Sequence, residues 1–438
     1  MGSNRFLFSI HDLCSSQIDS LESLTHSFLK KWLGIPQGGT WALVHDPHGL
    51  GIKSIRHIYL ESRSLSLSSI RCFGDEDVRH ALDVKEGRES KWSRKFSSAT
   101  YARDLLGEVA PPSGEVQVSL PNSLDDSFGS SIADPEGDAV TNEAPASNSQ
   151  PPSSRRVLKG RVQLGIKRQI SDFWRERVGQ YVMQGDYLAL HMEEQSCITW
   201  KSFMWDIPQG VLKFAINAGI NTLPSADNLK RWGKRVSDRC GFCGNIQTLA
   251  HILSNCASAL DQGRFTWRHD SVLKTVVSFV NQRLRNGFSL FSDLHGFQAP
   301  HGGVIPPNIL VTSLRPDIFL INEDTRIAVL FELTCPWEKN IERDHTYKEE
   351  KYSPLVADLS REYQVFQFSV EVSARGFISK ENKARIKAFS LKCCEARNAE
   401  IQNLIKMCSK AALLTSFSIF SARNEPSWSS PLPLLVRS

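Results

Sequence analysis

The stretch Leu314-Arg-Pro-Asp317-Ile-Phe-Leu-Ile321 is followed by a polar turn and by Arg326-Ile-Ala-Val-Leu-Phe-Glu332-Leu-Thr334. Two apolar runs joined by a short polar turn predict a β-hairpin. Asp317 starts the first strand and Glu332 ends the second, so antiparallel pairing places both at the same end of the hairpin. A carboxylate within such an apolar run is costly to bury unless a cation compensates it. We therefore expect the two carboxylates to converge on one divalent cation.

The residues after the hairpin continue a regular pattern. Residues 341–362 predict a helix that carries Lys348, Lys351, Tyr352 and Leu355 on one face. Residues 363–372 alternate as a strand, and residues 379–409 predict a further helix. This order predicts an α+β fold with a mixed sheet, of the kind found in restriction-enzyme-like nucleases. The alternative is an ordinary α+β domain whose Pro-Asp pair is only a turn at the start of a strand.

Upstream of the hairpin, four residues have the spacing of metal ligands. Cys240, Cys243, His251 and Cys256 form the pattern Cys-x2-Cys-x7-His-x4-Cys. Three cysteines and one histidine without a carboxylate are typical of a closed structural zinc site, and the first cysteine pair predicts a knuckle. His269 is a spare ligand if the register differs. The alternative is a set of buried cysteines and a core histidine that hold no metal.

The charge is unevenly distributed along the chain. The 438 residues include 52 Lys and Arg against 47 Asp and Glu, but residues 107–154 contain eight acidic residues and no basic one. Residues 155–177 hold eight basic residues, and a second basic run before the knuckle interleaves Arg231, Trp232, Lys234 and Arg235. Basic side chains follow phosphates and a tryptophan offers a stacking face, so a nucleic-acid partner is expected. A solvated helix face is the alternative.

These patterns divide the chain into five regions. We expect a helical region at 1–106, a disordered acidic linker at 107–154, a basic helical region with the zinc knuckle at 155–275, a mixed-sheet domain at 276–410 and a tail at 411–438. No run approaches the roughly 18 consecutive apolar residues of a spanning helix, and no signal peptide is recognisable. The ten cysteines fit reduced thiols better than a disulfide framework. We expect a nuclear or cytoplasmic protein that is not secreted.

Several segments resemble the C-terminal part of open reading frames from site-specific non-LTR retrotransposons. These elements carry a zinc knuckle and then a restriction-like endonuclease of the PD-(D/E)xK superfamily. The segments that carry the resemblance are the Cys3His pattern, Trp267-Arg-His-Asp270, Arg315-Pro-Asp317, Glu332-Leu-Thr-Cys-Pro-Trp-Glu338 and Lys348-x-x-Lys351-Tyr352. Phe28-Leu-Lys-Lys-Trp-Leu-Gly-Ile-Pro36 and Gly49-Leu-Gly-Ile-Lys53 look similar to the thumb and linker after the reverse transcriptase.

The sequence departs from this family pattern in two ways. No strand carries the aromatic-x-Asp-Asp pair of a polymerase, since Asp125-Asp126 falls in the acidic segment. Thr334 stands where the superfamily has lysine, and in this group of elements the lysine comes from the following helix. A polymerase activity is therefore not expected.

The resemblance implies Mg²⁺-dependent cleavage of one DNA strand, with element RNA as a second partner. Asp317 and Glu332 would hold the metal, and Lys348 first, or Lys351 second, would orient the attacking water. Tyr352 is expected to position these groups, and His269 to assist or to contact DNA. Arg268 joins the four residues of the second basic run as an expected nucleic-acid contact. The alternative function is a non-catalytic zinc-knuckle binding protein. A scaffold role has no support in the sequence.

Overall fold

The computed structural model describes residues 8, 13–87, 154–299 and 302–429. The chain divides into two units, which are Met1–His26 with Lys53–Asp172, and Ser27–Ile52 with Phe173–Ser438. Residues 88–153, which include the acidic segment up to Ser153, lie outside the described residues. The finer regional boundaries expected from the sequence stay predictions.

The first unit is helical where it is described. It contains α4 (Ile55–Phe73), α5 (Glu76–Gly87) and the first parts of α2 (Ser15–Leu33) and α7 (Arg155–Gln180). Leu60 of α4 packs against three residues of α7 at helical spacing, Leu158, Val162 and Ile166. Buried Glu61 accepts hydrogen bonds from Lys53 Nζ and Gln163 Nε2, both at 2.5 Å. The basic run that begins at Arg155 is thus helical and has an apolar stripe.

The helical part of the second unit surrounds a fully buried tryptophan, Trp200. Gly34 follows α2 with a φ of +70°, the left-handed conformation that glycine commonly adopts just after a helix. The elements of this part are α3 (Ala42–His45), α8 (Asp186–Glu193), the 3₁₀ turn Thr199–Phe203, α9 (Gln209–Gly219), α10 (Ala226–Arg231), the π-helical turn His251–Asn255, α11 (Ala257–Asp261) and α12 (Arg264–Arg283).

A four-stranded mixed sheet forms the rest of the second unit. Its strands are β1 (Ser289–Ser292), β2 (Ile318–Asn322), β3 (Ile327–Thr334) and β4 (Gln364–Glu371), in that spatial order. The first three strands pair antiparallel, whereas β4 pairs parallel to β3. The β3–β4 connection contains α13 (Ile341–Leu359), as a parallel crossover requires. The α+β class with a mixed sheet is therefore confirmed.

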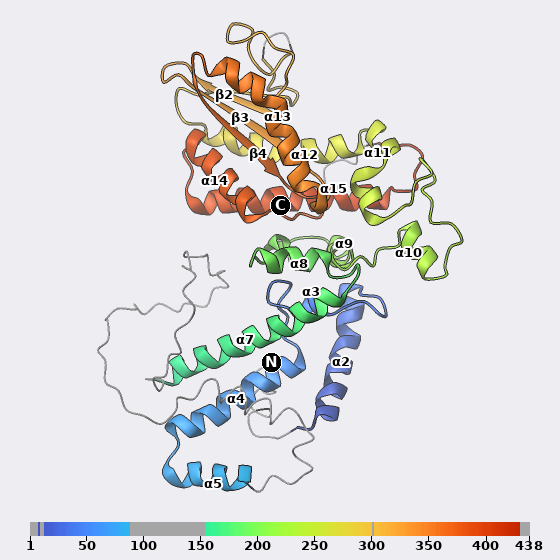
Figure 1. Cartoon of the computed structure of the whole chain (residues 1–438), viewed down its shortest axis with the longest axis vertical. Coiled ribbons are helices and arrows are strands. Elements are labelled where there is room, and N and C mark those ends of the chain that lie inside the picture. The colour runs from blue at the N-terminus through green and yellow to red at the C-terminus, as the bar shows by residue number, and fades with distance from the viewer. Residues whose placement is uncertain (1–7, 9–12, 88–153, 300–301, 430–438) are drawn as a thin grey trace. The chain divides into compact units, whose positions relative to one another are not determined.

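The sheet is covered by helices on both faces (Figure 1). On one face, Tyr352, Leu355 and Leu359 of α13 pack against Phe319 and Leu330. On the other face, α12, α14 (Lys380–Cys393) and α15 (Asn398–Ser421) pack against alternate strand residues such as Phe331 and Val370. Because strand side chains alternate, Asp317 and Glu332 share the α13 face with Phe319 and Leu330. This alternation points the two carboxylates toward the helix that carries the lysines.

One expected element is wrong. Residues 379–409 form no single helix, because the chain breaks between Cys393 and Asn398 and α15 continues to Ser421. Cys394 is extended there and pairs with Leu284. The Glu395 N–H donates to Arg283 O at 2.8 Å, and the Arg285 N–H donates to Cys393 O at 2.9 Å, so the break lies against the end of α12. Among the described helices, α15 alone is long and apolar enough to cross a membrane, but 67% of its apolar window is buried in the unit. That burial is typical of a core helix.

Candidate active site and metal centre

The four predicted metal ligands lie together in the second unit. The ligand atoms of Cys240, Cys243, His251 and Cys256 are all within 4.8 Å of one another, with Cys243 Sγ 3.3 Å from His251 Nε2. Hydrogen bonds from Gly244 N–H to Cys240 O and from Cys240 N–H to Asn245 O close the knuckle. Gly244 has a φ of +74°, which a residue with a side chain rarely adopts. This group can hold a metal ion and is compatible with Zn²⁺.

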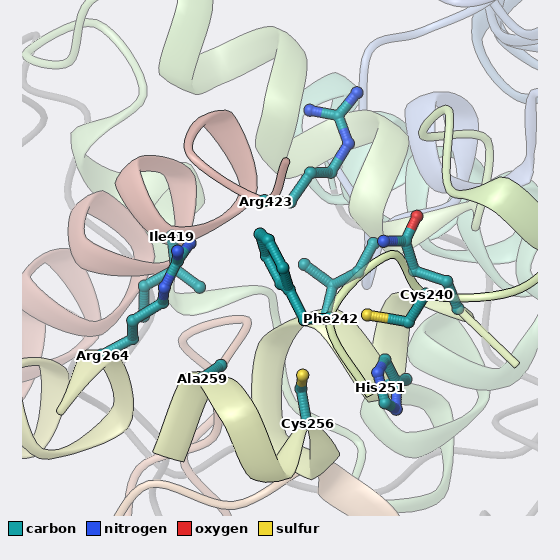
Figure 2. A pocket seen from close by; sticks show the side chains of 10 residues that line it. Cys240, Phe242, His251, Cys256, Ala259, Arg264, Ile419 and Arg423 are labelled. Carbon is teal, nitrogen blue, oxygen red and sulfur yellow. The ribbon is translucent and has the colours of Figure 1, made fainter. Parts of the chain in front are cut away.

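The surroundings of this metal centre fix it to the rest of the unit. Figure 2 shows Cys240, His251 and Cys256 gathered at one side of a pocket that Phe242, Arg264 and Arg423 also line. The Arg264 guanidinium lies 5.5 Å from the centre of the Phe242 ring. It also donates to Ala422 O at 2.6 Å and to Glu425 O at 2.7 Å. Arg264 therefore joins the knuckle to the residues after α15.

The two predicted carboxylates lie side by side across β2 and β3. Ile318 pairs with Phe331, so Asp317 lies opposite Glu332 at the next position of the ladder. The Asp317 N–H donates to Glu332 Oε1 at 3.1 Å, and the Leu333 N–H donates to Asp317 Oδ2 at 2.6 Å. Both side chains are buried, with exposed fractions of 7% and 1% for the two residues. The hairpin thus brings the carboxylates together as the sequence predicts.

The two lysines of α13 have different partners. Lys348 Nζ lies 2.7 Å from Glu332 Oε2 and forms an ion pair with it. Lys351 Nζ donates instead to the hydroxyl of Tyr352 at 3.1 Å. Tyr352 is itself buried and donates to Arg315 O at 2.7 Å, which holds the strand entry against the helix. The geometry therefore places Lys348, and not Lys351, at the carboxylates.

His269 of α12 reaches the same cluster from another element. Its Nε2 lies 3.3 Å from Asp317 Oδ2 and its Nδ1 lies 3.0 Å from Asp270 Oδ1. The candidate metal-binding group that contains Cys240, Cys243, His251 and Cys256 does not include His269. His269 lies instead beside Asp317, one of the two carboxylates predicted to bind a divalent cation.

Burial and mutual charge set the ionisation of this cluster. Burial and the neighbouring Asp317 carboxylate raise the pKa of Glu332 to about 7, although Lys348 acts against them. Burial also tends to raise the pKa of Asp317, but the charges of His269 and Lys348 hold it below its usual value. Burial tends to lower the pKa of His269, yet Asp317 and Asp270 raise it well above normal. The cluster thus combines two acids and two cations in a water-poor setting.

The predicted nucleic-acid contacts divide into exposed and buried residues. Trp232 is 42% exposed, and Lys234 and Arg235 are exposed in the segment that follows α10. Arg231 is exposed but forms an ion pair with Asp227. These four residues lie just before the metal centre in the chain.

The expectation that Arg268 contacts nucleic acid is wrong, because the residue is buried. Its exposed fraction is 1%, and its guanidinium donates to Leu253 O at 2.6 Å and to Cys335 O at 2.8 Å. Leu253 lies in the π-helical turn His251–Asn255, which carries one of the candidate metal ligands, and Cys335 follows β3. Arg268 therefore links the metal centre to the sheet. The resemblance drew attention to this residue, but a sequence pattern could not distinguish a buried arginine from an exposed one.

Two polar residues near the cluster were not anticipated. His345 lies one turn before Lys348 on α13, and its Nδ1 is 3.0 Å from Oε1 of Glu371, a residue that is 1% exposed. Glu371 is the last residue of β4 and pairs with Thr334, so it extends the row of acids on the α13 face. The signal was the Val-Glu-Val end of the strand at residues 370–372. A charged residue between two apolar ones indicates a buried carboxylate, as it does at Glu332.

No family model matches the chain, and no curated protein sequence matches it. The geometry of the site is therefore the ground on which a function can be proposed.

Proposed function

We propose that this chain is a metal-dependent DNA endonuclease that cleaves one strand at a time. The observation that carries the proposal is the meeting of Asp317, Glu332 and Lys348 at one place on the sheet. Asp317 N–H donates to Glu332 Oε1, and Lys348 Nζ is 2.7 Å from the other oxygen of Glu332. Two carboxylates and a lysine from strand, strand and helix are the functional groups of a PD-(D/E)xK nuclease.

The donor set fits a magnesium ion. Carboxylate oxygens are the protein ligands that Mg²⁺ prefers, and Asp317 and Glu332 supply them from adjacent strands. Bound there, the ion would lower the pKa of water and polarise the phosphate. In the proposed reaction, the oxygen of water bonds to phosphorus, the bond to the 3′ oxygen breaks, and a proton passes to that oxygen. The products are a 3′ hydroxyl and a 5′ phosphate.

The chain's own residues contribute orientation and charge. Lys348 holds its ammonium at Glu332, where it can orient the water and offset charge that builds on the phosphate. His269 contacts Asp317 and adds a second positive charge. Tyr352 ties α13 to Arg315 and so keeps Lys348 over the strands. These contacts hold the groups in place before a substrate arrives.

We further infer that the Cys3His group holds one Zn²⁺ with a structural role. Four protein ligands would fill a tetrahedral site and leave no position for a catalytic water. Such a site would present Trp232, Lys234 and Arg235 to DNA or to element RNA. The combination of knuckle and nuclease-like sheet is what supports an origin in a site-specific non-LTR retrotransposon.

A second candidate is a binding protein that lacks catalytic activity. It is favoured by the ion pairs themselves, because Lys348 neutralises Glu332 and His269 neutralises Asp317 without any metal. Buried charges that are paired in this way can be purely structural. The zinc group and the exposed basic residues would then account for the whole function.

Nicking of supercoiled plasmid DNA separates the two candidates. The full chain should convert plasmid to the open circle with Mg²⁺ and not with a chelator. Asp317→Asn should lower the rate by at least about 10²-fold, since a metal ligand is lost while no phosphate contact is removed. DNA affinity, measured by fluorescence anisotropy in Ca²⁺, should stay within about twofold of the wild type. If the wild type and Asp317→Asn nick the plasmid equally, the carboxylate cluster is not catalytic and the non-catalytic binding protein is the remaining candidate.

A further inference from the structure

A cavity of about 350 Å³ lies beside the carboxylate cluster, within the second unit. One wall is formed by Asn255, which precedes the zinc-group Cys256, and another by Phe265 of α12. Trp337 and Asn340, which follow β3, also line the cavity. His269 also lines the cavity, and its Nε2 lies 3.3 Å from Asp317 Oδ2. The cavity therefore shares a residue with the proposed active site.

The two aromatic rings of this cavity are held firmly by buried arginines. The Arg375 guanidinium lies 4.1 Å from the centre of the Trp337 ring, and the Arg268 guanidinium lies 5.4 Å from that of Phe265. Both arginines are nearly fully buried, and each is fixed by further hydrogen bonds, Arg375 to Glu338 and Arg268 to backbone carbonyls. Rings that are held in place are stacking platforms for nucleobases.

The polar groups of the lining suit the edge of a base. Asn255 and Asn340 each offer a donor and an acceptor, which is the pairing that amides make with adenine and related edges. One further lining residue, Ser254, has a buried hydroxyl Oγ without a hydrogen-bond partner in the described part of the chain. A buried donor without an acceptor is costly, so a ligand that supplies one is favoured.

The size of the cavity limits the occupant. Its volume is at the lower end of the range for small-ligand sites, which suits one nucleotide and excludes a base pair within a duplex. A base enters such a pocket only after it has left the stack, as enzymes that flip bases require. We propose that this cavity takes up one unstacked nucleotide of the DNA strand beside the scissile phosphate. This inference rests on the proposed nuclease function, since that function supplies the DNA.

The test uses the full chain and the four deoxynucleoside 5′-monophosphates in saturation-transfer NMR. Base protons should receive saturation from the protein, and deoxyribose 5-phosphate, which lacks a base, should bind at least tenfold more weakly. The double variant Asn255→Leu/Asn340→Leu should lose at least tenfold in nucleotide affinity at an unchanged melting temperature. Asn403→Leu, an exposed site on α15, is the matched control and should bind like the wild type.

Equal binding of deoxyribose 5-phosphate would overturn the inference, because it would reveal a phosphate site without base recognition. Unchanged affinity in the double variant would also overturn it. Plasmid nicking, measured on the same preparations, distinguishes the two proposals. A wild type that nicks but binds no nucleotide refutes only the cavity inference, whereas one that binds nucleotides and never nicks refutes the proposed function.

Discussion

Lys348 and Lys351 lie three residues apart on α13, yet only Lys348 reaches a carboxylate. We expect Lys348→Ala to lower the nicking rate by about 10²-fold or more, since it removes the charge that faces the reacting phosphate. Lys351→Ala should cost less than tenfold, as it removes a hydrogen bond to Tyr352. Both rates should be measured at saturating Mg²⁺ on variants with similar melting temperatures. The reverse order would mean that the wrong turn of the helix has been assigned.

His191 predicts a pH dependence of stability that does not involve the active site. The ring is fully buried between Tyr187 and Phe377, and burial, with Lys383, Arg375 and His48 nearby, lowers its pKa to about 3. The unfolded chain takes up a proton below about pH 6.5, while the folded chain does so only near pH 3. Stability is therefore lost as the pH falls through this window.

As the pH falls from 7.5 to 5, this histidine should lower the free energy of unfolding by about 2 kcal/mol. His191→Gln cannot titrate, so its free energy of unfolding should change less than that of the wild type by about this amount. Urea denaturation at the two pH values measures the difference, and all other titrating groups cancel between the two proteins. Parallel losses in both proteins would show that His191 takes up its proton over the same pH range in the folded and the unfolded chain.

At the scale of elements, the group of Cys240, Cys243, His251 and Cys256 leads to a prediction about metal content. The purified chain should contain about one zinc per molecule, and Cys243→Ser should lose it because a hydroxyl is a poor ligand compared with a thiolate. The released zinc can be measured with a colorimetric chelator. Cys197→Ser is the matched control, because Cys197 is exposed and lies outside the group. Zinc content that survives Cys243→Ser would exclude this ligand set.

The hairpin and α13 could be predicted from the sequence because their signals are local. Two apolar runs around a polar turn define β2 and β3, and the helical spacing of Lys348, Tyr352 and Leu355 defines α13. β1 is only four residues long and is formed by pairing with β2, so no local sequence pattern predicts it. The break after Cys393 likewise depends on a partner, Leu284, that is over 100 residues away. Such long-range pairing is not visible in one sequence.

At the scale of the whole molecule, the exposed basic residues predict how DNA binding responds to salt. Lys234→Glu/Arg235→Glu should weaken binding to all sequences alike and should flatten the dependence of affinity on salt, because fewer counterions are released. Lys380→Glu/Lys387→Glu changes the net charge equally at exposed sites on α14 and should have the smaller effect. Anisotropy titrations between 50 and 200 mM salt, a range of about fourfold, measure the slopes. Equal slopes would show that only net charge matters.

The central claim is that Asp317 and Glu332 share a divalent cation, and anomalous diffraction from a crystal soaked in Mn²⁺ tests it most directly. The account predicts one manganese peak within about 2.2 Å of an oxygen of each carboxylate, with Lys348 still beside Glu332. The same peak should be missing in Glu332→Gln. Manganese bound elsewhere, or an empty site in which Lys348 and His269 alone neutralise the two acids, would contradict the account.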